Sequence, residues 1–503
     1  MRLGDLLQGV PSLEIGASST VEITSLAYDS RRVEPGSLFF AIQGEKADGH
    51  DFIPAALERG AVAIVSERAA PAAYAARWVR VPKIRRALAE VARTFYNRPD
   101  SHLTLVGITG TNGKTTTAFL LESVFCAAGI PSGLFGTIEY RFGGQTLVAC
   151  NTTPESLDLL AYLSALVAAG GKAAVMEASS HALAQERLWG FRFSAAVFTN
   201  LTRDHLDYHK DFEHYFAAKR RLFEGLGTPP PDLAVLNADD PWAERLMDIP
   251  YPRRITYGFN SGAQIKAKQF NQTLSGLHAT LITPEGSLEV DSPLIGRANL
   301  ANILAATATA LGLGIAKEKV QEGIANLAAV PGRFERVDEG QPFLVVVDYA
   351  HTDDALRNLL KAARDLTRER LIVVFGCGGD RDRTKRPLMG EAAGALGDLV
   401  VLTSDNPRSE DPILIMNDVL VGLQKTGAAY IAEVDRETAI RTALTEAREG
   451  DVVVLAGKGH ESYQILKDRT VPFDDREVAR RVLREVGFHP GAVANWGGKP
   501  VRR

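Results

Sequence analysis

The sequence has few cysteines and almost no excess charge of either sign. Its three cysteines, Cys126, Cys150 and Cys377, form no CxxC or metal-ligand spacing, which is typical of a reducing compartment and predicts no disulfide. Lys+Arg 57 against Asp+Glu 61 gives a net charge of −4, so neither a nucleic-acid footprint nor a polybasic membrane patch is indicated.

Long apolar runs are also scarce. The N-terminus lacks the basic start and apolar core of a signal peptide, so we expect a cytoplasmic protein. One uncharged window, residues 298–316, is long enough to raise the question of a membrane span, but it contains Asn299, Asn302 and two glycines. A buried core helix is therefore expected there, with no membrane span. We expect a monomer with no nucleic-acid partner.

The length of the chain and its linkers, which are marked by glycine and proline, predict three domains of α/β class. Since single cores seldom exceed about 250–300 residues, the 503 residues divide into a small mixed α/β N-terminal domain (1–100), a central domain with a mainly parallel sheet (101–332) and a C-terminal Rossmann-like α/β domain (333–503). The first domain has β-prone runs at 22–26, 37–42 and 61–65. Apolar strands alternate with helical stretches in the other two, as in parallel sheets; these strands are expected at 103–109, 173–177, 195–200, 233–237, 343–347, 371–375, 399–403 and 452–456.

A glycine-rich loop joins the first of these central strands to a helix-prone stretch at 117–128. It reads Gly110-Thr111-Asn112-Gly113-Lys114-Thr115-Thr116. Glycines let backbone N–H groups approach phosphates, the lysine reaches the terminal phosphates, and the Thr115 hydroxyl can hold Mg²⁺. The usual P-loop spacing is not met, because Ile108 stands where its first glycine is expected. The loop nevertheless indicates an enzyme that uses a nucleoside triphosphate, so the central domain is predicted to be a P-loop-type ATPase domain. The alternative is a glycine-rich turn with a chance Lys-Thr pair.

Other polar groups follow the predicted strands at their carboxyl ends, where ligands bind in open α/β sheets. Glu177 ends one strand, and the groups 200–205, 348–351, 376–381, 405–408 and 457–461 follow others. We therefore expect an active-site cleft between the central and C-terminal domains.

The glycine-rich loop and six further motifs resemble those of the Mur ligases, enzymes that add amino acids to the peptidoglycan precursor. The motifs span residues 110–461, with a weaker match at 28–31; besides the loop they are Asn151-Thr152-Thr153-Pro154, 176–183, 204–209, 348–352, Asp405-Asn406-Pro407-Arg408 and 457–461. The resemblance implies ATP-dependent addition of meso-diaminopimelate to the D-glutamate of UDP-MurNAc-L-Ala-D-Glu through an acyl phosphate. There are three alternatives: the same ligation with L-lysine, a folylpolyglutamate-type ligase, and a P-loop switch, meaning a protein that hydrolyses nucleotide to change its shape.

For ATP and metal, the resemblance implies a site that gathers hard oxygen ligands around Mg²⁺. Thr115 and Glu177 are assigned to the ATP-bound ion, and His205 to a second metal. The alternatives are a capping acid for Glu177 and a hydrogen-bonded core histidine for His205. Asn299 and Arg333 are implied ATP contacts; the alternative for Arg333 is a surface arginine.

Lys219 is implied to be carbamylated by CO₂, which turns a cation into an anion that helps to hold the second Mg²⁺. Only a neutral amine reacts with CO₂, so the site must lower the pKa of this lysine, which burial would do. Arg220 and Arg221 add to that effect if they face inward. The alternative is a solvated surface lysine. Lys114, Lys219 and His205 are the expected catalytic residues.

For the two other substrates, the resemblance implies one group of residues each. The nucleotide-sugar peptide would be bound by Tyr28, Ser30, Glu45, Lys46, Ala47, Asp48, Asn151, Thr152, Thr153, Ser179, Gln185 and Arg187. Residues 29–31 could equally be a turn motif.

Diaminopimelate would be bound by Arg381, Asp405, Asn406, Pro407, Arg408, Gly457 and Glu461. Arg408 can capture the distal carboxylate in bidentate geometry, Glu461 the distal ammonium and Arg381 the proximal carboxylate. Related ligases that add L-lysine lack this Arg408. The sequence departs from the family at Asp353, where a proline is expected, which puts the rigidity of that loop in doubt.

Overall fold

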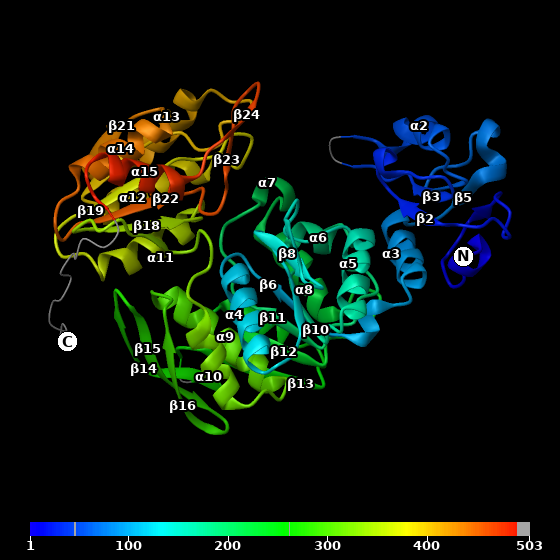
Figure 1. Cartoon of the computed structure of the whole chain (residues 1–503), viewed down its shortest axis with the longest axis horizontal. Coiled ribbons are helices and arrows are strands. Elements are labelled where there is room, and N and C mark those ends of the chain that lie inside the picture. Colours follow the sequence, from blue (N-terminus) through cyan, green and yellow to red (C-terminus); the bar gives the residue numbers. More distant parts are fainter. Residues whose placement is uncertain (45–46, 261, 490–503) are drawn as a thin grey trace.

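The computed structural model describes residues 1–44, 47–260 and 262–489. The described chain forms three bodies, each built around its own sheet, with the N-terminal body and the C-terminal body on opposite sides of the central one (Figure 1). No helix in these described ranges is both long enough and apolar enough to cross a membrane. The three-domain α/β architecture is as predicted.

The N-terminal body has a five-stranded sheet in the order β1-β5-β4-β3-β2, parallel except for β1. The three predicted β-prone runs correspond to β2, β3 and β4, and β5 was not predicted. The elements are α1 (Leu3–Leu6), β1 (Glu14–Ile15), β2 (Ser25–Ala27), β3 (Ser37–Phe40), α2 (Ile53–Glu58), β4 (Ala63–Ser66), β5 (Trp78–Arg80) and α3 (Ile84–Phe95). Strands β3 and β4 are buried and each pairs with a strand on both sides, so their sequences are mostly apolar.

The central body has an eleven-stranded sheet whose order is β16-β15-β14-β13-β12-β11-β6-β10-β7-β8-β9. Its parallel core contains the four predicted strands, which are confirmed as β6 (Thr104–Thr109), β10 (Ala173–Glu177), β11 (Ala195–Phe198) and β12 (Leu233–Asn237). The helices are α4 (Lys114–Ala127), α5 (Ser156–Ala168), α6 (Ser180–Ala184), α7 (Leu206–His209), α8 (Phe212–Glu224), α9 (Arg297–Gly312) and α10 (Lys317–Asn326). The uncharged window at 298–316 lies largely in α9, whose buried residues confirm a core helix.

The strands at both edges of this sheet were not predicted from the sequence. One edge adds β7 (Ser132–Phe135), β8 (Glu139–Phe142) and β9 (Gln145–Val148), and the other adds β13 (Arg253–Gly258), β14 (Ile265–Thr273), β15 (Gly276–Thr283) and β16 (Gly286–Ser292). Most of these strands are antiparallel and exposed on one face, so buried and exposed residues are mixed along them. Such strands lack the continuous apolar run that marks a parallel core strand.

The C-terminal body has a six-stranded sheet in the order β17-β18-β22-β19-β20-β21. The predicted strands are confirmed as β18 (Leu344–Asp348), β19 (Leu371–Phe375), β20 (Leu399–Leu402) and β22 (Val452–Ala456). Around them lie β17 (Glu335–Val337), α11 (Asp353–Arg364), α12 (Lys385–Leu396), α13 (Pro412–Leu423), β21 (Ala429–Ala432), α14 (Arg436–Glu446), the hairpin β23 (Tyr463–Ile465) and β24 (Thr470–Pro472), and α15 (Asp475–Glu485). A fully buried ion pair, Arg436 to Asp475 at 2.6 Å, ties α14 to α15.

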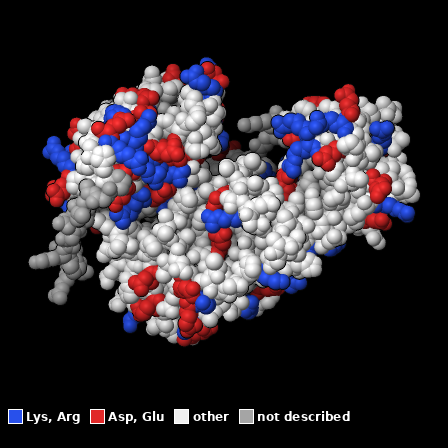
Figure 2. All heavy atoms as spheres, viewed as in Figure 1, with Lys and Arg blue, Asp and Glu red and all other residues white. Residues whose placement is uncertain are grey.

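Polar contacts join the three bodies. Between the first two, the Tyr28 hydroxyl donates to Asp158, and Arg86 pairs with Glu186 at 2.7 Å. Between the central and C-terminal bodies, the Asn112 side chain donates to Asp354 Oδ2 at 2.9 Å. Acidic and basic side chains are interspersed over the face in Figure 2, with no continuous basic stripe.

Candidate active site

The glycine-rich loop runs from the end of β6 into α4, and its glycines are sterically required. Gly113 has a φ of 87°, and a Cβ there would lie 2.3 Å from Asn302 Oδ1. A Cβ on Gly110 would lie 1.8 Å from Thr199 Oγ1. Gly113 is the N-cap of α4 and gives it no side-chain cap. The first N–H groups of the helix are therefore available to an anion.

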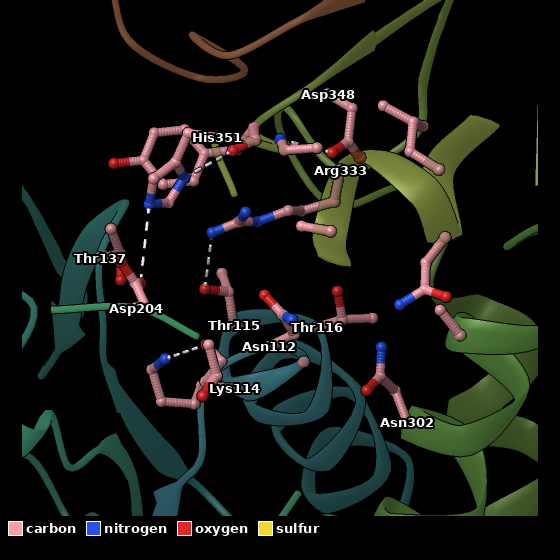
Figure 3. A pocket seen from close by; sticks show the side chains of 18 of the residues that line it. Asn112, Lys114, Thr115, Thr116, Thr137, Asp204, Asn302, Arg333, Asp348 and His351 are labelled. Atoms are coloured by element: carbon pink, nitrogen blue, oxygen red, sulfur yellow. Dashed lines mark hydrogen bonds and ion pairs between the residues drawn. The ribbon is translucent and has the colours of Figure 1, made fainter. Parts of the chain in front are cut away.

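Lys114 is the first residue of α4, and its ammonium is held inside the loop. Nζ donates to Gly110 O at 3.0 Å and to Thr111 O at 2.8 Å. Burial lowers the pKa of this ammonium. In Figure 3 the labelled loop residues Asn112, Lys114, Thr115 and Thr116 surround the start of this helix. A cation already placed at the helix start complements a bound phosphate.

Thr115 and Glu177 lie together, as a shared metal site requires. Thr115 Oγ1 donates to Glu177 Oε2 at 3.1 Å, and the backbone N–H of Thr137 donates to Glu177 Oε1 at 2.8 Å. Glu177 caps no helix, because Ser179 caps the following α6. The capping interpretation of Glu177 is therefore wrong. Two hard oxygen donors at a phosphate-binding helix start fit Mg²⁺.

His205 lies in the wall of the same pocket, with a left-handed backbone of φ 54°. Its Nε2 is 3.3 Å from Asp204 Oδ2 and its side chain is 40% exposed, so it is not a core histidine. Burial of the site, offset in part by Asp204, lowers the pKa of His205 to about 3. A neutral imidazole has a lone pair for a metal. The described residues contain no cluster of three or more His, Cys, Asp or Glu with metal-site geometry.

Lys219 is buried, at 2% exposure, and shares an acceptor with Lys114. Its Nζ donates to Gly110 O at 2.7 Å and lies 4.4 Å from the centre of the Tyr215 ring. Burial first, and then the charge of Lys114, lower the pKa of Lys219 well below its usual value. The alternative of a solvated surface lysine is therefore wrong.

The two neighbouring arginines do not produce this effect. Arg221 donates to Glu186 at 2.5 Å and to Ala184 O. Arg220 donates to Glu224 at 2.7 Å, an exposed contact. The inward-facing arrangement in which both would help to lower the pKa of Lys219 is not found, because each is satisfied away from it. Lys114 is the cation whose charge lowers the pKa of Lys219.

Asn299 and Arg333 approach the loop from two directions. Asn299 and Asn302 lie on α9, where Asn302 Nδ2 donates to Asn299 Oδ1 at 3.3 Å. Arg333 crosses from the start of the C-terminal body and donates to Thr115 Oγ1 at 3.1 Å (Figure 3). Its guanidinium carbon also lies 4.6 Å from the centre of the Tyr349 ring. Arg333 is therefore no ordinary surface arginine.

A cavity of about 260 Å³ joins these groups. It lies between the central and C-terminal bodies, where a cleft was expected. Its walls include residues 111–116, Glu177, Asp204, His205, Lys219, Asn299 and Arg333, and from the C-terminal body Asp348, Tyr349 and His351. Sequence reasoning assigned no role to Asp204 or Tyr349, although both stood in recognised motifs.

The residues expected to bind the peptide form a network on one side of this cavity. Thr153 Oγ1 donates to Glu177 O at 2.7 Å and accepts from the Ser179 backbone N–H at 3.0 Å. Arg187 donates to Thr153 O at 2.9 Å and to Gln185 Oε1 at 2.7 Å. Thr152 and Ser179 line the cavity, and Asn151 is exposed on the loop before them.

The first-domain residues do not reach this network directly. Tyr28 contacts the central body through Asp158. Ser30 opens a short helical turn in which Asp29 accepts from the Arg31 N–H, so the turn motif is present. Asp48 accepts from His50 and Arg68, and the contacts with His50 lower the pKa of Asp48 to about 2. Ala47 is exposed, while Glu45 and Lys46 lie outside the described residues.

The residues expected to bind the amino acid cluster in the C-terminal body, beside the main cavity. Asn406 Nδ2 donates to Glu461 Oε2 at 2.9 Å, and Lys458, buried beside them, donates to the same oxygen at 3.1 Å. Burial and Asp405 raise the pKa of Glu461. Gly457 must lack a side chain, because a Cβ there would lie 2.6 Å from Asp405 Oδ2.

Arg408, which follows Pro407, has a left-handed backbone of φ 52°, a strained conformation of the kind found at binding sites. Its guanidinium donates to Gly379 O at 2.8 Å. Burial, with the nearby charge of Arg381, lowers the pKa of Arg408. Arg408 therefore lies near a second guanidinium, Arg381, and near the carboxylates of Asp405 and Glu461. This mixture of charges fits a ligand with both carboxylate and ammonium groups.

Asp353 stands at the first position of α11, with Thr352 as the cap that accepts from the Ala355 N–H. Proline is also favoured at this position, so the departure leaves the helix start intact. An acid there also interacts favourably with the helix dipole. The Thr352 cap of this helix is therefore formed without the proline.

Family models match most of the chain. The Mur ligase family catalytic domain matches residues 22–96, the Mur ligase middle domain residues 108–310, and the glutamate ligase domain of Mur ligases residues 332–459. The chain is 58% identical to the UDP-N-acetylmuramoyl-L-alanyl-D-glutamate–2,6-diaminopimelate ligase of Solibacter usitatus, over 97% of this chain and 99% of that protein. It is 46% identical to the protein of the same name from Geobacter metallireducens, over 97% and 99%.

A solved structure of a ligase with this same name also resembles the chain throughout. The two share 34% sequence identity and a TM-score of 0.67, over 97% of this chain and 99% of the other. The similarity therefore extends across all three bodies.

Proposed function

The chain belongs to the Mur ligase family, and we propose that it is the ATP-dependent ligase that adds meso-diaminopimelate to the D-glutamate of UDP-MurNAc-L-Ala-D-Glu in peptidoglycan synthesis. The convergence of Lys114, Glu177, Lys219 and Arg333 on one interdomain cavity is the observation that carries this proposal. The reaction is placed in the cytoplasm, and the enzyme acts as a monomer. The proposed domain boundaries are 1–100, 101–332 and 333–503.

The reaction needs an activated carboxylate, because a carboxylate and an amine do not condense in water. A carboxylate oxygen of the peptide attacks the terminal phosphorus of ATP, and the bond from that phosphorus to the departing ADP breaks. The amine of diaminopimelate then attacks the carbonyl carbon of the acyl phosphate. The tetrahedral intermediate expels phosphate and the nitrogen loses a proton. Lys114 and the start of α4 hold the phosphates during these steps.

Mg²⁺ would supply positive charge that offsets the negative charge developing on the phosphate oxygens. Thr115 and Glu177 would hold the ATP-bound ion, and His205 a second one. Lys219 would act as a carbamate: its neutral amine attacks CO₂, a nitrogen–carbon bond forms and a proton leaves. The low pKa of this buried lysine supports that modification.

The other substrates are assigned by position. Thr152, Thr153, Ser179, Gln185 and Arg187 bind the peptide beside Glu177, with Asn151 at the entrance. The first domain binds the nucleotide through Tyr28, Ser30 and residues 45–48. The cluster in the C-terminal body, which includes Arg381, Arg408 and Glu461, binds the charged groups at the two ends of diaminopimelate. Asn299 and Arg333 contact ATP.

The two alternative functions, a folylpolyglutamate-type ligase and a P-loop switch, leave features of this structure unexplained. A folylpolyglutamate-type ligase gives no reason for Arg408 beside Glu461 or for a separate first domain. A P-loop switch predicts a single nucleotide domain, whereas the described residues form three bodies, each built around its own large sheet.

ATP turnover separates the three possibilities. We expect continuous, multiple-turnover ADP release only when UDP-MurNAc-L-Ala-D-Glu and diaminopimelate are both supplied, with an amide product by mass spectrometry. Turnover with a folate substrate, or with ATP alone, would contradict the proposed function.

Arg408 supplies a test of amino-acid choice. Arg408→Ala removes the proposed partner of the distal carboxylate, a group that lysine lacks. Truncating one partner of a buried charge pair costs about 2–5 kcal/mol, so the preference for diaminopimelate over lysine should fall by at least about thirtyfold. The measurement is the ratio of kcat/KM for the two amino acids. Arg383→Ala, at an exposed arginine of the same body, is the matched control; an unchanged ratio in Arg408→Ala would show that Arg408 does not read the substrate.

A further inference from the structure

The first turn of α12 carries two buried cations where a helix favours acids. Lys385 and Arg386 open this helix, and its first turn has no acidic residue. Lys385 is 7% exposed and Arg386 is fully buried. A cation at a helix N-terminus opposes the helix dipole, and burial adds a desolvation cost. Local conflicts of this kind are expected at functional sites.

Arg386 has partners that offset its cost. Its Nη1 donates to Asp418 Oδ2 at 2.9 Å and its Nη2 donates to Glu410 Oε1 at 2.8 Å. Asp418 lies on α13, and Glu410 just precedes that helix. Arg386 therefore anchors the start of α12 to its neighbour and is a structural residue.

Lys385 has no such partner. Among the residues that the structure describes, none makes a hydrogen bond or salt bridge with its ammonium. Its charge, with those of His205 and His351, helps to lower the pKa of Asp204, and after burial it helps to lower the pKa of His351; Asp204 and His351 both line the cavity between the domains. These two side chains face each other across that cavity, with His351 Nε2 3.9 Å from Asp204 Oδ2 (Figure 3).

The neighbouring residue fixes this placement. Arg203, which precedes Asp204, donates through Nη1 to Thr384 Oγ1 at 2.7 Å. Thr384 is the N-cap of α12 but gives the helix no side-chain cap. The start of α12 thus combines uncapped N–H groups with an unpaired buried ammonium, held against the central body. Both features favour an anion.

We propose that Lys385 and the start of α12 are the C-terminal domain's contact to the phosphoryl group as it passes from ATP to the peptide carboxylate. This inference rests on the proposed function. The transfer brings the triphosphate and a substrate carboxylate close to the carboxylates of Glu177 and Asp204, so added positive charge lowers the barrier. Lys114 supplies charge from the central domain, and Lys385 supplies it from the domain that binds the amino acid. The two cations would therefore act together only when the two domains meet.

The test compares Lys385→Met, Lys385→Arg and a matched control, Lys425→Met, at an exposed lysine of the same body. The readout is the single-turnover formation of ADP from ATP, Mg²⁺ and UDP-MurNAc-L-Ala-D-Glu before diaminopimelate is added. We expect Lys385→Met to slow this step at least about 10²-fold, with the Kd for ADP and the Tm unchanged. Lys385→Arg keeps the charge and should recover much of the rate. Lys425→Met should match the unmodified enzyme.

Three results would overturn the assignment. ADP formation at the normal rate in Lys385→Met would remove the proposed contact. A loss shared equally by Lys385→Arg, with a lower Tm, would make the role structural. An unchanged first step with a raised KM for diaminopimelate would move Lys385 to the amino-acid site. Absence of turnover in the unmodified enzyme would instead contradict the proposed function itself.

Discussion

Lys219→Ala is expected to be nearly inactive, and added formate or acetate is expected to restore part of its rate. The substitution removes the proposed carbamate, so the second metal, which would organise the acyl phosphate, loses an anionic ligand. A loss of at least about 10²-fold is expected for a group of this kind. A short carboxylate can enter the space left by the side chain and supply two oxygens in place of the carbamate. The measurement is the ligation rate against carboxylate concentration.

The control for this experiment is Arg220→Ala, one residue further along α8. Arg220 pairs with Glu224 at the surface, so its loss should change the rate little and carboxylates should have no effect. Mass spectrometry of the intact active enzyme should also show CO₂ added to Lys219 under native conditions. An active enzyme whose Lys219 stays unmodified at saturating bicarbonate would refute the carbamate.

Lys114→Ala is expected to abolish ligation while leaving the fold intact. Among the described residues, the ammonium donates hydrogen bonds to two carbonyl groups of its own loop, Gly110 O and Thr111 O, so its removal should leave the core packing unchanged. A cation that meets the terminal phosphates stabilises the charge that develops in the transition state, and its loss should lower kcat/KM at least about 10²-fold.

The measurement is steady-state ligation, with thermal unfolding to confirm the fold. Lys172→Ala, at an exposed lysine of the central body, is the matched control and should behave like the unmodified enzyme. Turnover near the normal level in Lys114→Ala would contradict the ATP site. A large fall in Tm would show that the lysine serves the fold instead.

The parallel strands and the loop after β6 could be predicted because their signals are local. Strands buried on both faces must be apolar along their whole length, so β10, β12, β19 and β22 were found at their observed limits. Glycine is required where a Cβ would collide with a neighbour, as at Gly113. The edge strands β14 to β16 lack a continuous apolar pattern, and they were missed.

The orientation of side chains around a helix could not be predicted. The sequence placed Lys219, Arg220 and Arg221 together, but only packing decided that Lys219 points at Gly110 while the two arginines pair with Glu224 and Glu186. The partner of a side chain depends on which distant segment lies opposite.

The sequence by itself determined the fold class, the phosphate-binding loop and the motifs that identify the family, since each depends on residues close together in the chain. Only the tertiary structure decided that Arg333 reaches Thr115 and that Arg203 reaches Thr384, the residue before Lys385. These contacts join residues from two domains that are far apart in sequence. Their physical cause is the packing of one folded body against another, which no local pattern of residues encodes.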